Sequence, residues 1–435
     1  MSGARALLQE LLHLCGLGLL VGLACWPFNL LDRWQDQWLG LLPSFGGGPW
    51  SPASLALAAA PLLVVPLLLL LQRGICARGA GSGIPQTMTS IEDPQRADAL
   101  LAPAVTLQRF GLWAVATLAL LPMGREGPVL QVGASVAWAV RRRFPALLPR
   151  LPAPDLLVLA AGAGLAGGFN TPLMAVVFVV EEFAGRFASP LLWPALVACA
   201  VAAAFSNLTG QPMFALGRLS TEVPEWLQVL WAVPIGALGG MLGALFGVAL
   251  LGFTRRCAPL LRHRPLALGL AVGAVLSAFL LLSGGASGGD GERLMHGLVK
   301  SAAALGPSPW LPATSPLRDL ALLLMRLLGP VLALGVGIPG GLIDPAFAFG
   351  AVFGRLCGGL AGMGALGTAL GMAAGLAGAT QLPVATVLFA LRLAADQQLL
   401  PGLVVAAVLA AYVSRLLLPQ PIYHALRQIT LASTR

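Results

Sequence analysis

The stretch Gly124-Arg125-Glu126-Gly127-Pro128 places a carboxylate and a guanidinium in a sequence that is otherwise rich in Leu, Ala, Val and Gly. A charged side chain inside a lipid bilayer costs at least a few kcal/mol, so such a residue usually has a function. The glycines around it allow another group to approach the backbone closely. Glu126 is therefore the first candidate for a residue that does chemistry.

Pro128 and the residues after it indicate how Glu126 is positioned. Proline fits the first turn of a helix because its missing N–H would be unpaired there. The apolar run Val129–Val140 ends at three arginines, and about 12 residues make about 18 Å of helix, against about 30 Å of hydrocarbon in a bilayer. We expect a half-helix that begins inside the membrane, with its free N–H groups and positive dipole end facing an anion in the interior.

The composition is that of a membrane protein. Of 435 residues, 57% are hydrophobic and 10% are charged, and the mean hydropathy is +0.85. These values exclude a soluble globular domain and predict a polytopic helical membrane protein. The net charge of +9 comes from arginines at the ends of segments, which favours a membrane surface over nucleic acid. Neither the cysteines nor the histidines have the spacing of a disulfide framework or a metal site, so we expect no metal and no cofactor.

The first hundred residues predict two membrane spans. We expect Leu11–Leu23 to lie in a retained helix, because no cleavage site of a signal peptide follows it. A loop is predicted from 27 to 52, with tryptophans as interfacial anchors at Trp34, Trp38 and Trp50. Ala53–Leu71 is then predicted as a second span that two prolines interrupt, Pro61 and Pro66.

Two further stretches resemble the start of a helix at Gly124. Gly81-Ser82-Gly83-Ile84-Pro85 and Gly340-Gly341-Leu342-Ile343-Asp344-Pro345 also place glycines ahead of a proline. Broken helices at membrane depth leave backbone groups unpaired, which is tolerated only around a cavity or a ligand. We expect the three helix N-termini to meet around a dehydrated anion, held by partial charges that are weak enough to allow its release.

Other segments of the second half carry weaker signals. The stretch 207–225 is predicted to be a linker, and the arginines at 255–264 are predicted to form a basic turn between two spans. Gly284–Gly291 is glycine-rich but lacks the Lys-Ser/Thr of a phosphate-binding loop, so we expect an exposed loop there.

The two halves of the chain repeat. Gly124, Pro128 and Gly133-Ala134 have the same spacing as Gly341, Pro345 and Gly350-Ala351, and a second block, 163–178, matches 374–389. Paired interrupted segments predict a transporter whose site lies at the midplane between two repeats. We expect one integral membrane domain made of two halves, 1–215 and 216–435, with no soluble domain.

Five motifs, in order, resemble the signature of the CLC family of chloride channels and chloride/proton antiporters. They are G-S-G-I-P at 81–85, G-R-E-G-P at 124–128, F-N-T-P-L followed by E-E within 169–182, G-G-L-I-D-P at 340–345 and P-Q-P-I-Y at 419–423. The resemblance covers essentially the whole chain. It implies an all-α polytopic membrane protein with a CLC-type inverted repeat, in which broken half-helices meet at a midplane anion site. It also implies a homodimer in a bacterial inner membrane, without C-terminal nucleotide-sensing domains.

The resemblance assigns roles to individual residues. The hydroxyls of Ser82 and Tyr423 and the amides of Leu342 and Ile343 would hold the central anion. Glu126 would be the gating glutamate, and Glu182 would be the internal proton-transfer glutamate of a chloride/proton antiporter. The motif residues at the helix N-termini would be Gly81, Gly83, Pro85, Gly124, Arg125, Gly127, Pro128, Gly341 and Pro345. The implied partners are chloride, protons, a second copy and the lipid bilayer, with no nucleic acid and no enzymatic activity.

Several alternatives remain at this stage. The chain would be a passive chloride channel if its anion flux were uncoupled, or a fluoride exporter if its anion were different. Ile343 stands where the family usually has phenylalanine, and Gln86 replaces a common glutamate. Asp344 would repel anions unless it caps its helix or turns away. Glu126 and Ser82 alone would fit helix caps, Glu182 and Tyr423 would fit interfacial positions, and Arg109 and Arg125 are expected to be structural.

Overall fold

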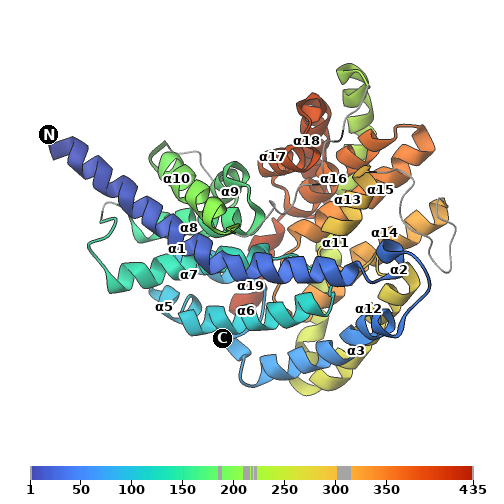
Figure 1. The fold of residues 1–435 in the computed structure, drawn as a ribbon, viewed down its shortest axis with the longest axis horizontal. Helices are drawn as coiled ribbons and strands as arrows, with labels where there is room; N and C mark the ends of the chain where they lie inside the picture. The colour runs from blue at the N-terminus through green and yellow to red at the C-terminus, as the bar shows by residue number, and fades with distance from the viewer. Residues whose placement is uncertain are drawn as a thin grey trace.

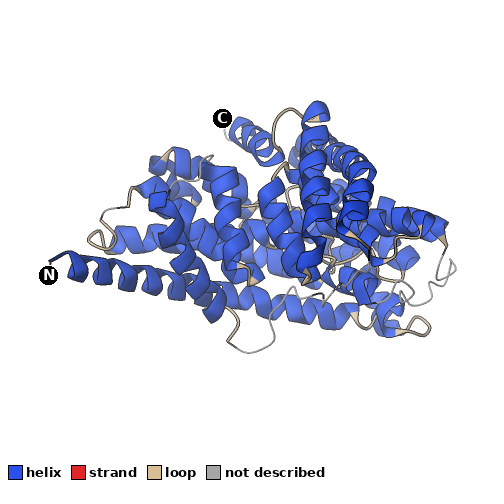
Figure 2. Cartoon of the chain, turned by 90° about the horizontal axis from the view of Figure 1, so that it is seen from above, coloured by secondary structure: helices blue, strands red, loops and turns tan. Residues whose placement is uncertain are grey.

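The computed structural model describes residues 2–149, 151–184, 189–208, 216, 219, 223–300 and 315–433, and these residues are almost entirely helical, without a strand (Figures 1 and 2). The first helices are α1 (Ser2–Leu39), α2 (Pro43–Gly46), α3 (Pro52–Arg73), α4 (Ile84–Glu92), α5 (Ala97–Leu100), α6 (Pro103–Leu118), α7 (Glu126–Arg143), α8 (Ala153–Phe169), α9 (Pro172–Val179) and α10 (Ser189–Phe205). They are followed by α11 (Glu225–His263), α12 (Pro265–Ser283), α13 (Glu292–Lys300), α14 (Pro316–Gly335), α15 (Ile343–Ala361), α16 (Ala365–Thr380), α17 (Pro383–Ala394), α18 (Leu400–Leu417) and α19 (Ile422–Ser433). Short 3₁₀ turns lie at Ala77–Gly79, Pro94–Arg96 and Gln397–Leu399, and a π-helical turn, η3, lies at Val180–Ala184.

The helices include several that can cross a bilayer. Among the described residues, five segments are long and apolar enough to cross a bilayer. Four lie within α1, α3, α11 and α12, and the fifth consists of α18 and the 3₁₀ turn before it. The stretch 94–100 and helix α6 are together long and apolar enough for a broken span or a re-entrant loop, with a bend of 54° between them. The chain is therefore an integral, multi-pass membrane protein, as the composition predicts.

Helix α1 extends further than the sequence suggested, so the predicted loop from 27 to 52 is wrong over its first half. Several polar side chains of this stretch, although not that of Asp36, are buried and hydrogen-bonded to the protein interior. Asn29 Nδ2 donates to Gly167 O at 3.1 Å, and Gln35 Nε2 donates to Thr117 O at 2.9 Å. Because these donors are satisfied by neighbouring helices, the helix continues past Pro27 to Leu39.

Two further predicted breaks are absent from the described helices. Helix α3 is continuous through Pro61 and Pro66, since α12 packs directly against the two prolines. Gly269 and Gly273 of α12 allow this close approach, because a Cβ on either would lie 2.5 Å from an atom of Pro66 or Pro61. The predicted basic turn is also wrong, since α11 is continuous to His263.

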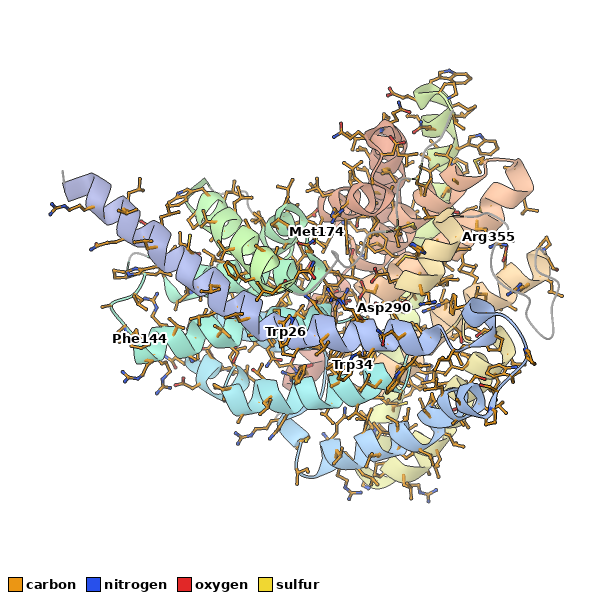
Figure 3. All side chains as sticks on the ribbon, viewed as in Figure 1. Trp26, Trp34, Phe144, Met174, Asp290 and Arg355 are labelled. Atoms are coloured by element: carbon orange, nitrogen blue, oxygen red, sulfur yellow. The ribbon has the colours of Figure 1, made fainter. Side chains whose placement is uncertain are left out.

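The glycine-rich segment 284–291 is buried, so the prediction of an exposed loop is wrong. Arg326 of α14 donates to its carbonyls, with Nε 2.8 Å from Ala286 O and Nη2 2.7 Å from Gly288 O. Four of its glycines have positive φ, which lets the chain turn tightly around the guanidinium. The loop brings Asp290 against the C-terminal end of α1, where its backbone N lies 3.4 Å from Gln35 Oε1 (Figure 3).

The segments with repeated spacing pack in the same way in both halves of the chain. Gly133 of α7 lies against α8, where its Cβ would be 2.9 Å from Gly164 N, and Gly350 of α15 lies against α16, where its Cβ would be 3.1 Å from the Cα of Gly375. Both pairs therefore pack backbone to backbone through small residues. Most of the predicted linker around residue 215 lies outside the described residues.

Candidate functional site

The starts of α4, α7 and α15 lie together in the protein interior. Gly124 and Gly341 form an antiparallel backbone pair, in which each N–H donates to the other carbonyl at 2.9 Å. Gly81 N donates to Gly337 O at 2.9 Å, and a Cβ on Gly83 would lie 2.7 Å from Gly127 O. The glycine-rich motifs that the sequence singled out are therefore in direct backbone contact.

The helices themselves are longer than the sequence suggested. Helix α7 begins at Glu126 and has 18 residues, which correspond to about 27 Å, so the expected length of about 18 Å is too small, although the helix is still shorter than about 30 Å of hydrocarbon. The helix gains length at both ends, because Glu126 and Gly127 are already helical and the three arginines extend its last turn. Its start is nevertheless buried, as is that of α15, with Glu126 0% and Ile343 1% exposed. The prolines lie in the first turns of their helices, at Pro85, Pro128 and Pro345.

The carboxyl group of Glu126 lies at the start of α15. Its Oε1 accepts a hydrogen bond from the backbone N–H of Ile343, and its Oε2 has no hydrogen-bond partner among the described residues. A Cβ on Gly341 would overlap this carboxyl group. The carboxylate therefore occupies the position where free amides at a helix N-terminus would otherwise bind an anion.

The buried hydroxyl groups of Ser82 and Tyr423 have no hydrogen-bond partner among the described residues, and the same holds for Thr106, Thr117, Thr171 and Thr386. Ser82 does not cap α4, because the residue at the cap is Gly83, whose N–H donates to Gln86 Oε1 at 3.0 Å. Tyr423 is 0% exposed, which excludes an interfacial position. Its ring packs edge-on against Phe178, with 6.2 Å between centroids. Buried hydroxyls are normally paired, so both are available to a ligand.

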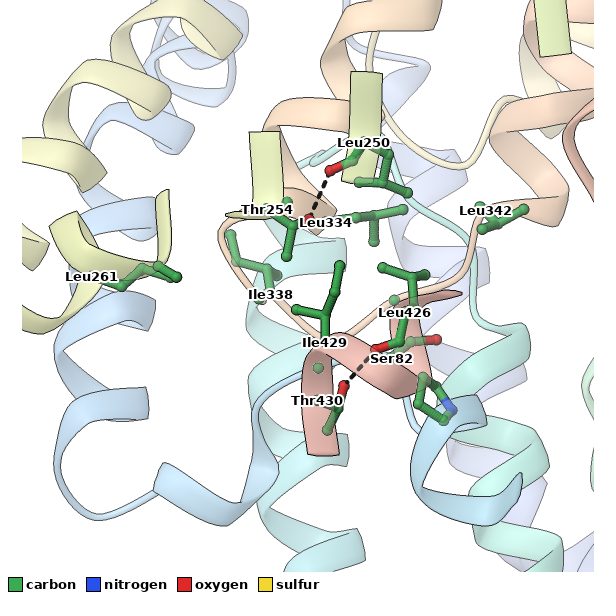
Figure 4. Close-up of a pocket in the computed structure, with 16 residues that line it drawn as sticks. Ser82, Leu250, Thr254, Leu261, Leu334, Ile338, Leu342, Leu426, Ile429 and Thr430 are labelled. Atoms are coloured by element: carbon green, nitrogen blue, oxygen red, sulfur yellow. Dashed lines mark hydrogen bonds between the residues drawn. The ribbon is translucent and has the colours of Figure 1, made fainter. Parts of the chain in front are cut away.

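A cavity of about 210 Å³ leads to Ser82 and Leu342 (Figure 4). Its wall comes from α11, the end of α14, the loop before α15, and α19, and most of its side chains are apolar. They include Leu250, Leu334, Ile338, Leu426 and Ile429. Polar groups of the wall, such as Thr254 and Thr430, bond to carbonyls of their own helices, so the cavity presents few competing donors (Figure 4).

Arg109 holds the loop that carries Ser82. Its guanidinium is 1% exposed and donates from Nε to Gly81 O at 3.0 Å and from Nη2 to Ala80 O at 2.9 Å. It also donates to Gln131 Oε1 of α7. These bonds support the expected structural role of Arg109, because they fix the start of α4 relative to α7.

Arg125 forms an ion pair that the sequence did not indicate. It bonds to Asp32 of α1, and its Nη2 lies 3.9 Å from a carboxylate oxygen of Glu292. Asp32, Glu292 and Asp290 have carboxylate oxygens within 4.8 Å of one another. The guanidinium already supplies the positive charge of this group, so the arrangement is that of an ion-pair network. Asp32 was not found from the sequence because it lies in the stretch that was expected to be a loop.

Glu181 and Glu182 lie in the π-helical turn η3 and have different surroundings. Glu181 accepts hydrogen bonds from the N–H groups of Val384 and Ala385, at 3.3 and 2.9 Å, and so caps α17. Glu182 is 6% exposed, and its Oε1 lies 3.7 Å from Nε2 of His424. The His424 side chain is 38% exposed. No pattern in the sequence distinguished this histidine.

The fold and the site together define a helical membrane protein with a buried site at which helix N-termini meet. The chain belongs to the CLC family, since the family model for the voltage gated chloride channel matches residues 63–415. A relative from Vibrio campbellii, the H(+)/Cl(-) exchange transporter ClcA, is 29% identical over 338 residues, which cover 72% of this chain and 67% of the relative. ClcA from Vibrio parahaemolyticus is 27% identical over 337 residues, covering 72% and 67%.

Solved structures of the family share the fold. A slow cyanobacterial Cl⁻/H⁺ antiporter has a TM-score of 0.75 at 22% identity, covering 98% of both chains. A eukaryotic CLC transporter has a TM-score of 0.77 at 21% identity, covering 97% of this chain and 75% of the other. A CLC-type fluoride/proton antiporter has a TM-score of 0.73 at 24% identity, covering 96% and 98%. The all-α, CLC-type architecture expected from the motifs is therefore confirmed.

Proposed function

We propose that the chain exchanges chloride for protons across the membrane. The observation that carries this proposal is the hydrogen bond from the Ile343 N–H to the Glu126 carboxyl group. An ionised Glu126 and a chloride ion compete for the same donors at the start of α15. A protonated Glu126 is a weaker acceptor and leaves these donors to the anion. Proton binding and anion binding are then coupled through one side chain.

The anion in this proposal is held by weak donors. The hydroxyls of Ser82 and Tyr423 and the amides of Leu342 and Ile343 surround it without a full positive charge, which allows release into the cavity that leads to Ser82. The lack of protein partners for both hydroxyls supports this assignment. The positive charge of Arg125 is already balanced by Asp32.

Glu182 is the proposed second proton carrier. It is buried beside His424, whose side chain is 38% exposed, so an imidazole lies between Glu182 and the protein surface and can pass a proton inward. Tyr423 precedes His424 in α19, and its ring packs against Phe178 of α9, the helix that leads into the turn with Glu182. A proton would move from Glu182 to Glu126 across this region.

Further parts of the proposal depend on the family and its relatives. The Vibrio relatives are named H(+)/Cl(-) exchangers, which supports chloride and protons as the transported ions and a bacterial inner membrane as the location. We also propose a homodimer of this chain. Its two halves, 1–215 and 216–435, would form an inverted repeat, which the common packing of α7 on α8 and of α15 on α16 supports.

The test uses purified protein in chloride-loaded liposomes, with chloride efflux and external pH recorded together. A chloride gradient is expected to drive proton movement in the wild type. E126Q and E182Q are expected to retain chloride flux and to lose proton movement. E181Q is the matched control, because it changes the adjacent carboxylate but keeps an oxygen that accepts from the start of α17.

The two alternatives give different results in the same liposomes. Chloride flux without proton movement in the wild type would make the chain a passive chloride channel. Fluoride flux without chloride flux would make it a fluoride exporter. Loss of proton movement in E181Q but not in E182Q would refute the role given to Glu182.

A further inference from the structure

Asp344 is a buried acid that neither of its expected roles explains. It is the second residue of α15, but neither of its carboxylate oxygens accepts a hydrogen bond from a described residue, so it does not cap the helix. Its side chain is 0% exposed, so it does not turn away toward solvent. Buried polar groups are nearly always paired in proteins, and an unpaired one calls for a functional explanation.

The carboxyl group of Asp344 lies beside that of Glu126. A Cβ on Gly124 would be 2.7 Å from Asp344 Oδ2 and would overlap Glu126 Oε2, so both oxygens lie against the same side of Gly124. Neither oxygen has a hydrogen-bond partner among the described residues. Two buried carboxylates this close do not both remain ionised, because the repulsion is strong where water is excluded.

Other charges around the pair do not remove this repulsion. Arg125 is paired with Asp32 and lies 3.9 Å from Glu292, while Arg326 donates to carbonyls of the buried loop 284–291. The titratable and charged groups that act on the two carboxyl groups come from α1, the loop 284–291, α19 and the start of α7. They are Asp32, Asp290, Tyr423 and Arg125. The two aspartates outnumber the one arginine in this set, so one proton on the pair relieves an excess of negative charge.

We propose that Asp344 is a second proton-binding carboxyl group of the anion path, which shares a proton with Glu126 when Glu126 occupies the start of α15. The proton lies between Asp344 Oδ2 and Glu126 Oε2. When Glu126 leaves as the neutral acid, this proton leaves with it, and Asp344 must take up another proton before an anion enters beside it. Anion entry is then linked to two protons, of which one belongs to Asp344.

This inference rests on the proposed function for the identity of the anion, and the first experiment measures binding without transport. Chloride is titrated calorimetrically into purified E126Q and E126Q/D344N over a series of pH values. In E126Q the Kd for chloride is expected to rise by up to about tenfold per pH unit as Asp344 loses its proton, the dependence for one linked proton. In E126Q/D344N it is expected to change by less than about twofold. An E126Q variant whose Kd is independent of pH would overturn the proposal.

A matched control separates this effect from a general change at a helix start. D155N makes the same substitution in the first turn of α8, and E126Q/D155N is expected to keep the pH dependence of E126Q. A loss of pH dependence in this control as large as that in E126Q/D344N would also overturn the proposal.

A second measurement does not depend on chloride. Infrared spectra of the wild type in chloride-free buffer are expected to contain a C=O stretch of a protonated carboxyl group that D344N removes. The D155N spectrum is expected to retain it. An unchanged protonated-carboxyl signal in D344N would refute the shared proton. If no variant binds chloride, the proposed substrate fails, and the infrared result still decides the role of Asp344.

Discussion

Gly341 offers a direct test of the position of Glu126. A Cβ at Gly341 would overlap the Glu126 carboxyl group, so G341A is expected to displace this side chain from the start of α15. The backbone of Gly341 does not have a positive φ, so alanine fits its conformation. The perturbation therefore acts on the carboxyl group, while the pair with Gly124 uses backbone atoms and can remain.

The expected change in chloride affinity of G341A follows from the loss of the hydrogen bond between the Ile343 N–H and the Glu126 carboxyl group. A hydrogen bond between an amide and a charged carboxylate contributes about 1.5–3 kcal/mol. At about 1.4 kcal/mol per factor of ten, its loss shifts the balance between Glu126 and the anion by about 10- to 100-fold. We expect G341A to bind chloride more tightly by this factor and to conduct chloride with little proton movement, as E126A would.

The assay is the liposome experiment combined with chloride titration calorimetry. G111A serves as the control, because a Cβ on Gly111 meets nothing within 4 Å, and it should behave as the wild type. The double variant E126A/G341A tests whether the new methyl group itself blocks the path. Full proton coupling in G341A, or chloride affinity equal to that of the wild type, would refute the position assigned to Glu126.

Three other substitutions test the surroundings of the site. Y423F removes a hydroxyl without a protein partner, so we expect an unchanged Tm and a Kd for chloride about 5- to 10-fold higher, whereas Y412F on the exposed surface should alter neither. R109A leaves the carbonyls of Ala80 and Gly81, beside Ser82, unpaired, and we expect a loss of about 2–6 kcal/mol of stability, measured as a lower Tm in detergent, with R109K restoring part of it. H424Q removes the titratable group beside Glu182, so we expect slower proton movement with chloride binding unchanged; equal proton rates would contradict a role for His424.

The residues at the helix starts were predictable because their chemistry is local. Glycines shortly before a proline in an apolar chain indicated buried helix N-termini at 81–85, 124–128 and 340–345, although Gly329-Pro330 lies inside α14. The structure places all three such motifs in contact, although α7 begins two residues before Pro128. Local rules gave the position of Glu126 correctly and the length of its helix incorrectly.

The remaining features depend on contacts between distant segments. Asp32 and Gln35 are polar and lie in the stretch that was expected to be a loop. Their partners, Arg125 and Thr117, lie more than eighty residues away in sequence, so no local pattern indicated that both side chains are buried in a helix. The buried loop 284–291 is explained only by Arg326, which no local pattern connects to it. In a membrane protein, polar residues find partners on neighbouring helices, so polarity alone does not separate a loop from a helix that faces the interior.

The backbone pair between Gly124 and Gly341 has a mechanical consequence. Residues that exchange two hydrogen bonds in an antiparallel pair keep their Cα atoms about 5.5 Å apart. These two hydrogen bonds hold the starts of α7 and α15 together. Separating the two helices would break both bonds at a buried position, where water does not readily replace them. For the proposed exchange we therefore expect side chains to rotate against a fixed frame, so a covalent cross-link between α7 and α15 away from the path should leave the exchange rate unchanged.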